Sequence, residues 1–92
     1  MNIVSQIGAY RNITTSTNCL ARTGGLIGIF VASASSTPVI TVYDSATTTT
    51  TTLIVNAFVP IGGTFYPIPA SVTNGVYVVI SGTIDCTVFT IA

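Results

Sequence analysis

The sequence predicts an all-β protein, specifically a small antiparallel β-sandwich of about seven strands. Threonine, isoleucine and valine dominate the 92 residues, and these β-branched side chains pack well on a pleated sheet but lose freedom in a helix. Turn-forming clusters interrupt the chain at short intervals, as in sandwiches and barrels. A chain of this length forms one domain around a single core.

The turn clusters delimit the expected strands in order. After an N-terminal segment, a strand at 13–21 ends at Thr23-Gly24-Gly25, and an apolar strand at 26–33 ends at Ser35-Ser36-Thr37-Pro38. A strand at 39–43 ends at Asp44, where we expect the carboxylate to bond the backbone two residues further on. The threonine run from Thr47 to Thr52 predicts an extended loop that leads into the next strand, rather than a regular ice-binding array.

The second half of the chain continues in the same manner. A strand at 51–59 ends at Pro60-Ile61-Gly62-Gly63, and a short strand at 64–68 ends at Pro69-Ala70-Ser71. Asn74-Gly75 predicts a tight turn with Gly75 at positive φ, followed by strands at 76–81 and 84–91 that Gly82-Thr83 separates.

Alternation within the strands indicates which side chains face the core. Residues i and i+2 share one face of a strand, so Val78 and Ile80 lie together, as do Tyr77 and Val79. Several strands are apolar on both faces, which indicates that neighbouring subunits cover one of them. The residues that we expect in the core are Val42, Ile54, Phe58, Val78, Ile80 and Val88.

The first twelve residues lack alternation, and we expect residues 1–12 to form an extended arm outside a sandwich domain at 13–92. Ile3, Val4, Ile7 and Tyr10 are too apolar for an idle tail, so we expect the arm to dock on a neighbour and to be ordered only in an assembly. Arg11 and Arg22 flank the first strand, and each is either a contact to a neighbour or a solvated side chain.

Charge is nearly absent, and this excludes several function classes. The charged side chains are Arg11, Arg22, Asp44 and Asp85, the formal net charge is zero, and no histidine is present. Acid–base and nucleophilic catalysis lack their usual base, so we expect no enzyme, no catalytic residue and no cofactor. Two arginines cannot neutralise a nucleic-acid backbone. A chain with so little charge tends to associate with copies of itself.

Neither membrane insertion nor metal binding is expected. The apolar stretches are far shorter than the roughly 20 residues of a spanning helix, and the N-terminus does not have the pattern of a secretory signal. Two cysteines without histidine leave Zn²⁺ under-coordinated, and two aspartates are too few for Ca²⁺. We expect Cys19 and Cys86 to be buried thiols, with a disulfide that joins the terminal strands as the alternative.

The region from residue 24 to residue 91 resembles small virion proteins of tailed bacteriophages. The resemblance rests on Val42-Tyr43-Asp44-Ser45, on Pro60-Ile61-Gly62-Gly63-Thr64 with Pro67, and on Asn74-Gly75-Val76-Tyr77-Val78 with Ser81-Gly82-Thr83 and a closing strand from Val88 to Ile91. The threonine run and the first twelve residues depart from that pattern.

The resemblance implies a jelly-roll-like sandwich that acts as a capsid decoration (cement) protein, and it carries over no catalytic residue. On this expectation the chain is found in the virion, assembled in the host cytoplasm, and binds between subunits of the major capsid protein as a homo-oligomer, most simply a trimer. The alternative is a receptor- or glycan-binding module on a tail or fibre, in which Tyr43, Tyr66 or Tyr77 would contact the sugar.

Overall fold

The computed structural model describes residues 8–92, which form one antiparallel sheet of six strands. The strands are β1 (Ala9–Ile13), β2 (Thr17–Leu20), β3 (Gly24–Tyr43), β4 (Leu53–Phe58), β5 (Thr64–Val72) and β6 (Val76–Ile91). Every strand pair is antiparallel. The expected all-β class is therefore confirmed. Residues 8–92 contain no helix, and so none that is long and apolar enough to cross a membrane.

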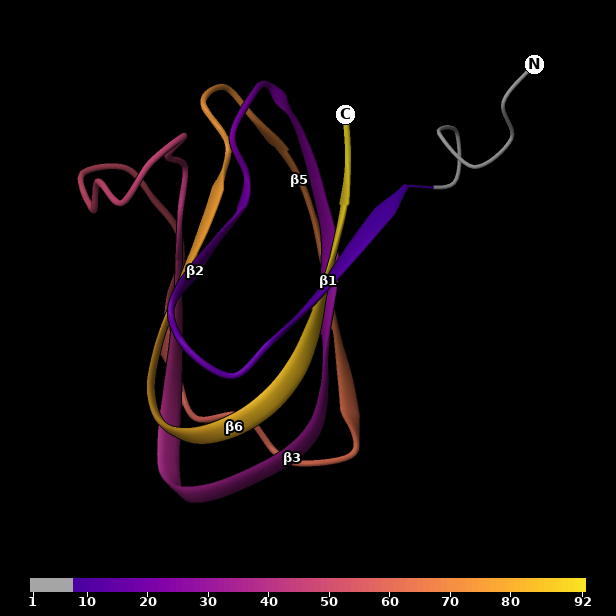
Figure 1. Cartoon of the computed structure of the whole chain (residues 1–92), viewed down its shortest axis with the longest axis vertical. Coiled ribbons are helices and arrows are strands. Elements are labelled where there is room, and N and C mark those ends of the chain that lie inside the picture. The colour runs from indigo at the N-terminus through magenta and orange to yellow at the C-terminus, as the bar shows by residue number, and fades with distance from the viewer. Residues whose placement is uncertain (1–7) are drawn as a thin grey trace.

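Two long strands give the molecule its shape. β3 and β6 pair along almost their entire length, from Gly25↔Ile91 to Tyr43↔Tyr77, and both bend in the middle (Figure 1). The bend folds one sheet into two facing halves. Half A contains β1, β5 and the paired segments 24–35 and 83–91, whereas half B contains β2, β4 and the paired segments 39–43 and 76–81. The result is sandwich-like, although the two halves belong to the same hydrogen-bonded sheet.

A large bulge produces the bend. Between the pairs Ser35↔Thr83 and Val39↔Ser81, β3 places residues 36–38 opposite Gly82 alone. Extra residues in one strand curve it and increase its twist. Ser36 and Thr37 adopt left-handed φ values of 61° and 49°, and Gly82 has a φ of 84°. A Cβ atom on Gly82 would lie 2.7 Å from the Cα of Pro38, so only glycine fits there.

The observed strands differ in number and extent from the seven expected. The clusters at 35–38 and 82–83 bend continuous strands instead of ending them, because both strands keep their pairing on either side. Of the expected strand at 13–21, Thr17–Leu20 form β2, whereas β1 lies mostly before it, at Ala9–Ile13. β5 runs on through Pro67 and Pro69 to Val72, because β5 is an edge strand and proline is tolerated at a sheet edge.

The core lies between the two halves and is aliphatic. Its buried residues are Ile13, Leu26, Ile29, Val31, Val72, Ile84, Cys86 and Val88 from half A, and Ile40, Val42, Val76 and Val78 from half B. Of the expected core residues, Val42, Val78 and Val88 are completely buried. Ile54, Phe58 and Ile80 are half-buried and pack against this core from its margin.

Asp44 and Ser45 follow the end of β3, and their side chains form hydrogen bonds that fix the chain there. The Asp44 carboxylate accepts hydrogen bonds from the backbone N–H groups of Thr73 (3.0 Å), Asn74 (2.8 Å) and Gly75 (3.1 Å). Our expectation of a local Asp44 turn is therefore wrong. The hydroxyl of Ser45 makes the local bond instead, since it accepts from the N–H of Thr47 at 3.1 Å. Asp44 thus holds the 73–75 turn onto half B.

The N-terminal arm was expected to cover residues 1–12. Residues 9–12 belong to β1, whose pairs with β6 include Ala9↔Thr90 and Asn12↔Thr87. Ile3, Val4 and Ile7 lie outside the described residues, so the docking of an arm stays a prediction. In Figure 1, β1 lies at the side of the molecule that carries half A.

Candidate functional site

The outer face of half A carries a cluster of aromatic side chains. Phe30 of β3 lies directly opposite Phe65 of β5, and Tyr10 of β1 lies opposite Phe89 of β6. Residues directly opposite each other in an antiparallel pair point to the same face. The rings of Phe65 and Phe89 meet edge to face with centroids 6.2 Å apart. We call Tyr10, Phe30, Phe65 and Phe89 the aromatic face.

Much of the aromatic face is accessible to solvent. Tyr10 is 77% exposed, Phe65 46% and Phe30 39%, and the neighbouring Ile27 is also exposed. Large apolar side chains that are grouped on a surface mark interaction sites, whereas single ones do not. Aromatic residues are also enriched in protein interfaces.

Gly28 allows the Phe65 ring to lie close to the backbone of β3. A Cβ atom at residue 28 would be 2.6 Å from Cζ of Phe65 and 2.6 Å from the carbonyl oxygen of Tyr66. Gly28 pairs with Phe89 of β6 on one side and with Pro67 of β5 on the other. The Phe65 ring occupies the space over Gly28, where a larger side chain would stand. The glycine therefore makes the aromatic face continuous across the strands.

A polar group borders the aromatic face. The Nδ2 of Asn12 donates to the Asp85 carboxylate at 2.9 Å, to the Cys86 carbonyl at 3.0 Å and to the Thr87 hydroxyl at 3.3 Å. Asp85 is thus engaged in a surface hydrogen bond that holds β1 to β6. Asp44 holds the 73–75 turn, so both aspartates have structural partners.

The aromatic side chains on the outer face of half B are less exposed than those of half A, although Leu53 on that face is 48% exposed. Tyr43 and Tyr77 are half-buried, with ring centroids 6.5 Å apart. Tyr66 lies elsewhere: it is opposite the buried Ile29, and its hydroxyl accepts a hydrogen bond from the N–H of Ile61 at 2.8 Å. The structure therefore brings together two of the three tyrosines that a sugar platform would use, and separates the third.

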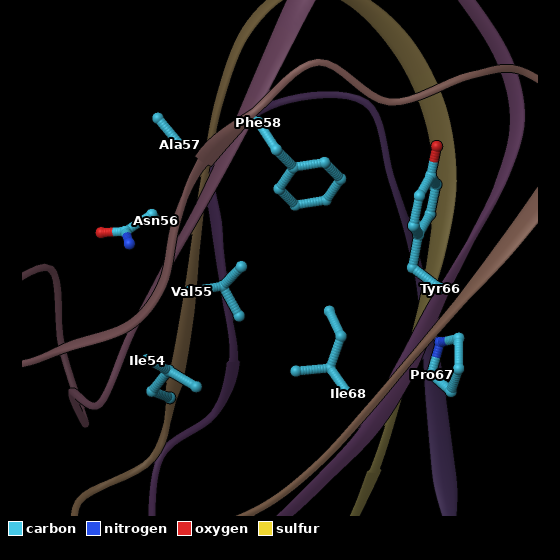
Figure 2. Close-up of a pocket in the computed structure, with 8 residues that line it drawn as sticks. All are labelled: Ile54, Val55, Asn56, Ala57, Phe58, Tyr66, Pro67 and Ile68. Carbon is cyan, nitrogen blue, oxygen red and sulfur yellow. The ribbon is translucent and has the colours of Figure 1, made fainter.

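An apolar groove of about 470 Å³ lies between β4 and β5, where the two halves face each other without a strand between them. Figure 2 shows Val55, Phe58 and Ile68 pointing into it. The rings of Phe58 and Tyr66 stand 5.2 Å apart, centroid to centroid, so they bridge the two strands. The other lining residues are Ile54, Asn56, Ala57 and Pro67. Among residues 8–92, no charged side chain lines this groove.

The expected contact residues within the described part of the chain do not share one surface: Tyr10 and Arg11 are neighbours on β1, and Arg22 lies elsewhere. Tyr10 belongs to the aromatic face. Arg11 is exposed on β1, and Arg22 is exposed in the turn between β2 and β3. Arg11 lies opposite the buried Val88, whereas Tyr10 lies opposite Phe89, so Arg11 is on the other face of β1 from the aromatic face.

Both cysteines are free thiols in the described structure. Burial raises the pKa of Cys19 to about 11, and the nearby charge of Arg11 opposes that increase. Burial also raises the pKa of Cys86 to about 11. In the part of the chain that the structure describes, no three side chains of Cys, Asp or Glu gather to hold a metal ion. The protonated thiols are poor nucleophiles and poor metal ligands.

The sequence analysis missed Phe30, Phe65 and Phe89. Alternation places Phe65 on the same face as Pro67, and Phe89 on the same face as Thr87. The sequence therefore indicates which face of its own strand each phenylalanine occupies. Only the strand register brings residues 10, 30, 65 and 89 to one place, and a register between such distant segments does not follow from alternation.

No protein-family model, no curated protein and no solved structure matches this chain.

Proposed function

We propose that this chain is a non-enzymatic structural protein of a phage particle, which decorates the capsid between capsid subunits and associates with copies of itself, as a trimer in the simplest arrangement. The aromatic face is the observation that carries the proposal. The resemblance of residues 24–91 to small phage virion proteins supports the location in a phage particle.

The chemistry of the surface favours a structural partner over a substrate. The aromatic face combines apolar area with few charges, and the whole chain has two positive and two negative side chains. Removal of apolar surface from water is favourable by about 25 cal/mol for each Å², from which the entropic costs of association are subtracted. A capsid shell repeats the same surface many times, so many copies of this protein could bind it through the aromatic face.

Detection of the chain in purified phage particles tests the proposed location. Mass spectrometry of particles separated on a density gradient should find it at a fixed copy number relative to the major capsid protein. Its absence from particles that contain all other structural proteins would contradict the proposal.

Two matched substitutions test the face. Phe65→Asp places a charge on the aromatic face, and Leu53→Asp places the same charge on half B at nearly equal exposure (46% and 48%). We expect Phe65→Asp to weaken binding to particles at least tenfold and Leu53→Asp to leave it within about twofold. Equal effects of the two substitutions would show that the aromatic face is not the contact.

A further inference from the structure

In the described part of the chain, the groove between β4 and β5 is bordered by unpaired strand edges, to which one more strand could be added. Within residues 8–92, β4 and β5 each pair with β3 alone, so each has a free edge on the same side of the molecule. The Phe58–Tyr66 ring pair closes the groove beneath the 59–63 loop, and Gly63 fixes that loop through a hydrogen bond from its N–H to the Val31 carbonyl (2.6 Å).

The two edges differ in their capacity to pair. β5 contains Pro67 and Pro69, which have no N–H group to donate, and proline is a common protection of sheet edges. β4 has the sequence LIVNAF, with neither proline nor charge. The pairing of β4 with β3 contains bulges at residues 54 and 56–57, but every residue of β4 has an N–H group. Backbone pairing with an incoming extended chain is therefore less obstructed along β4 than along β5, in the mode known as β-strand addition.

The walls of the groove define the chemistry of its occupant. Ile54, Val55, Phe58 and Ile68 supply apolar surface, and Asn56 supplies the one amide side chain among the lining residues. A charged segment would lose its hydration there without a partner. The occupant is therefore an extended, uncharged segment with aliphatic side chains.

Residues 1–7 of this chain have that composition. They read MNIVSQI, with no charged side chain and with Ile3, Val4 and Ile7 as aliphatic groups. Seven extended residues span about 23 Å. The strand segment 54–58, which lines the groove, contains five residues and spans about 16 Å, so seven residues are long enough to cover it.

The donor segment must come from another copy. β1 begins at Ala9 on one edge of half A, and β6, β3 and β5 lie in order between it and the groove. A path around the outside crosses three strand spacings of about 4.8 Å and then the separation of about 10 Å between the halves. This path uses the full reach of seven residues, and none would be left to pair with β4.

We propose that residues 1–7 of one copy bind as an added strand along β4 in the groove of a second copy. The proposal rests on the self-association that is part of the proposed function, and it names the segment and the surface that make the contact. The contact is heterologous, so identical copies form a closed ring if the rotation allows it.

Complementation between two full-length variants tests the exchange. Ile3→Asp places a charge in the donor segment, and Ile68→Asp places one in the groove. Ala57→Asp, at an exposed groove position, serves as a second groove variant that disturbs the core less. Ile61→Asp adds the same charge to an exposed side chain outside the groove and is the matched control. Melting temperatures establish that each variant is folded.

We expect sedimentation velocity to show self-association of the wild-type chain and of Ile61→Asp. The donor variant and the groove variants should each associate at least tenfold more weakly. An equimolar mixture of the donor variant with a groove variant should form a complex of two chains and no larger species, because one intact segment and one intact groove remain.

Three results would overturn the inference: a monomeric wild-type chain, a donor variant that associates as the wild type does, or a folded pair that forms no complex. Loss of particle binding in the groove variants alone would identify a strand of another virion protein as the occupant, which also overturns it. Particle content is measured independently, so a chain that exchanges segments but is absent from particles contradicts only the proposed function.

Discussion

Half A and half B have the same kind of inner face and different outer faces. Valine and isoleucine from both halves meet in one core, for example Ile29 and Val31 from half A with Ile40 and Val42 from half B. On the outside, half A exposes Phe30, Phe65 and Tyr10, whereas half B keeps Tyr43 and Tyr77 half-buried.

The difference separates the residues that maintain the fold from those available for contact. Because β3 and β6 run through both halves, each half has the same backbone support. The inner faces of both halves are aliphatic, and their packing in one core stabilises the domain. The outer faces are not interchangeable, since within the part of the chain that the structure describes only that of half A has a group of exposed aromatic rings.

The largest expected effects come from truncating the core in either half. Ile29→Ala in half A and Ile40→Ala in half B remove equal volume from completely buried positions. Each should lower the free energy of unfolding by about 2–5 kcal/mol, measured by urea denaturation. A cost at one site below about 1 kcal/mol would show that the two halves do not share one core.

A glycine substitution tests the turn that closes half B. A Cβ atom at Gly75 would collide with the carbonyl oxygen of Leu20 and lie 2.6 Å from that of Ser45. Gly75→Ala should cost about 3 kcal/mol, because backbone atoms must move. Gly63→Ala is the control: its φ is 77° with no atom within 4 Å, so it should cost about 1–2 kcal/mol. Equal costs would contradict the predicted collision.

The Asp44 carboxylate makes the stability of half B dependent on pH. Burial tends to raise its pKa, but the hydrogen bonds from Thr73, Asn74 and Gly75 outweigh this and hold the pKa below its usual value. The stabilisation is therefore complete above the unfolded pKa of about 4, and it is lost as the pH falls through the lower folded value.

Asp44→Asn should accordingly lower the free energy of unfolding by about 1–2 kcal/mol at pH 7. Its difference from the wild type should shrink at low pH, as followed by urea midpoints between pH 7 and pH 2. Asp85→Asn, which changes one surface hydrogen bond to Asn12, should cost less than about 0.5 kcal/mol. A difference that does not change with pH would exclude the carboxylate as the cause.

The last prediction concerns the reactivity of the cysteines, one in each half, and not the stability of the fold. Both thiols have a pKa of about 11, so at pH 8 each should react with a thiol reagent about a hundredfold more slowly than an exposed cysteine. Cys86 is completely buried in half A and Cys19 is half-buried in half B. Mass spectrometry of partly alkylated protein should find Cys19 modified first. Modification of Cys86 first would indicate that half A opens more readily than half B.

The sequence by itself determined the all-β class and several of the positions at which the chain turns or bends, although not all: β5 continues through the expected turn at 69–71. β-Branched residues favour strands wherever they occur, and glycine and proline act on their immediate neighbours, so both signals are local. Val42, Val78 and Val88 were correctly placed in the core for the same reason, since alternation along one strand defines its two faces.

Only the tertiary structure decided which signals end a strand and which bend it. The cluster at 35–38 resembles a turn in isolation, but it lies opposite Gly82 in a ladder that continues on both sides, so it curves the sheet. The aromatic face and the groove have the same origin. Each depends on the register between strands that are distant in the chain, and a two-residue alternation leaves that register undetermined.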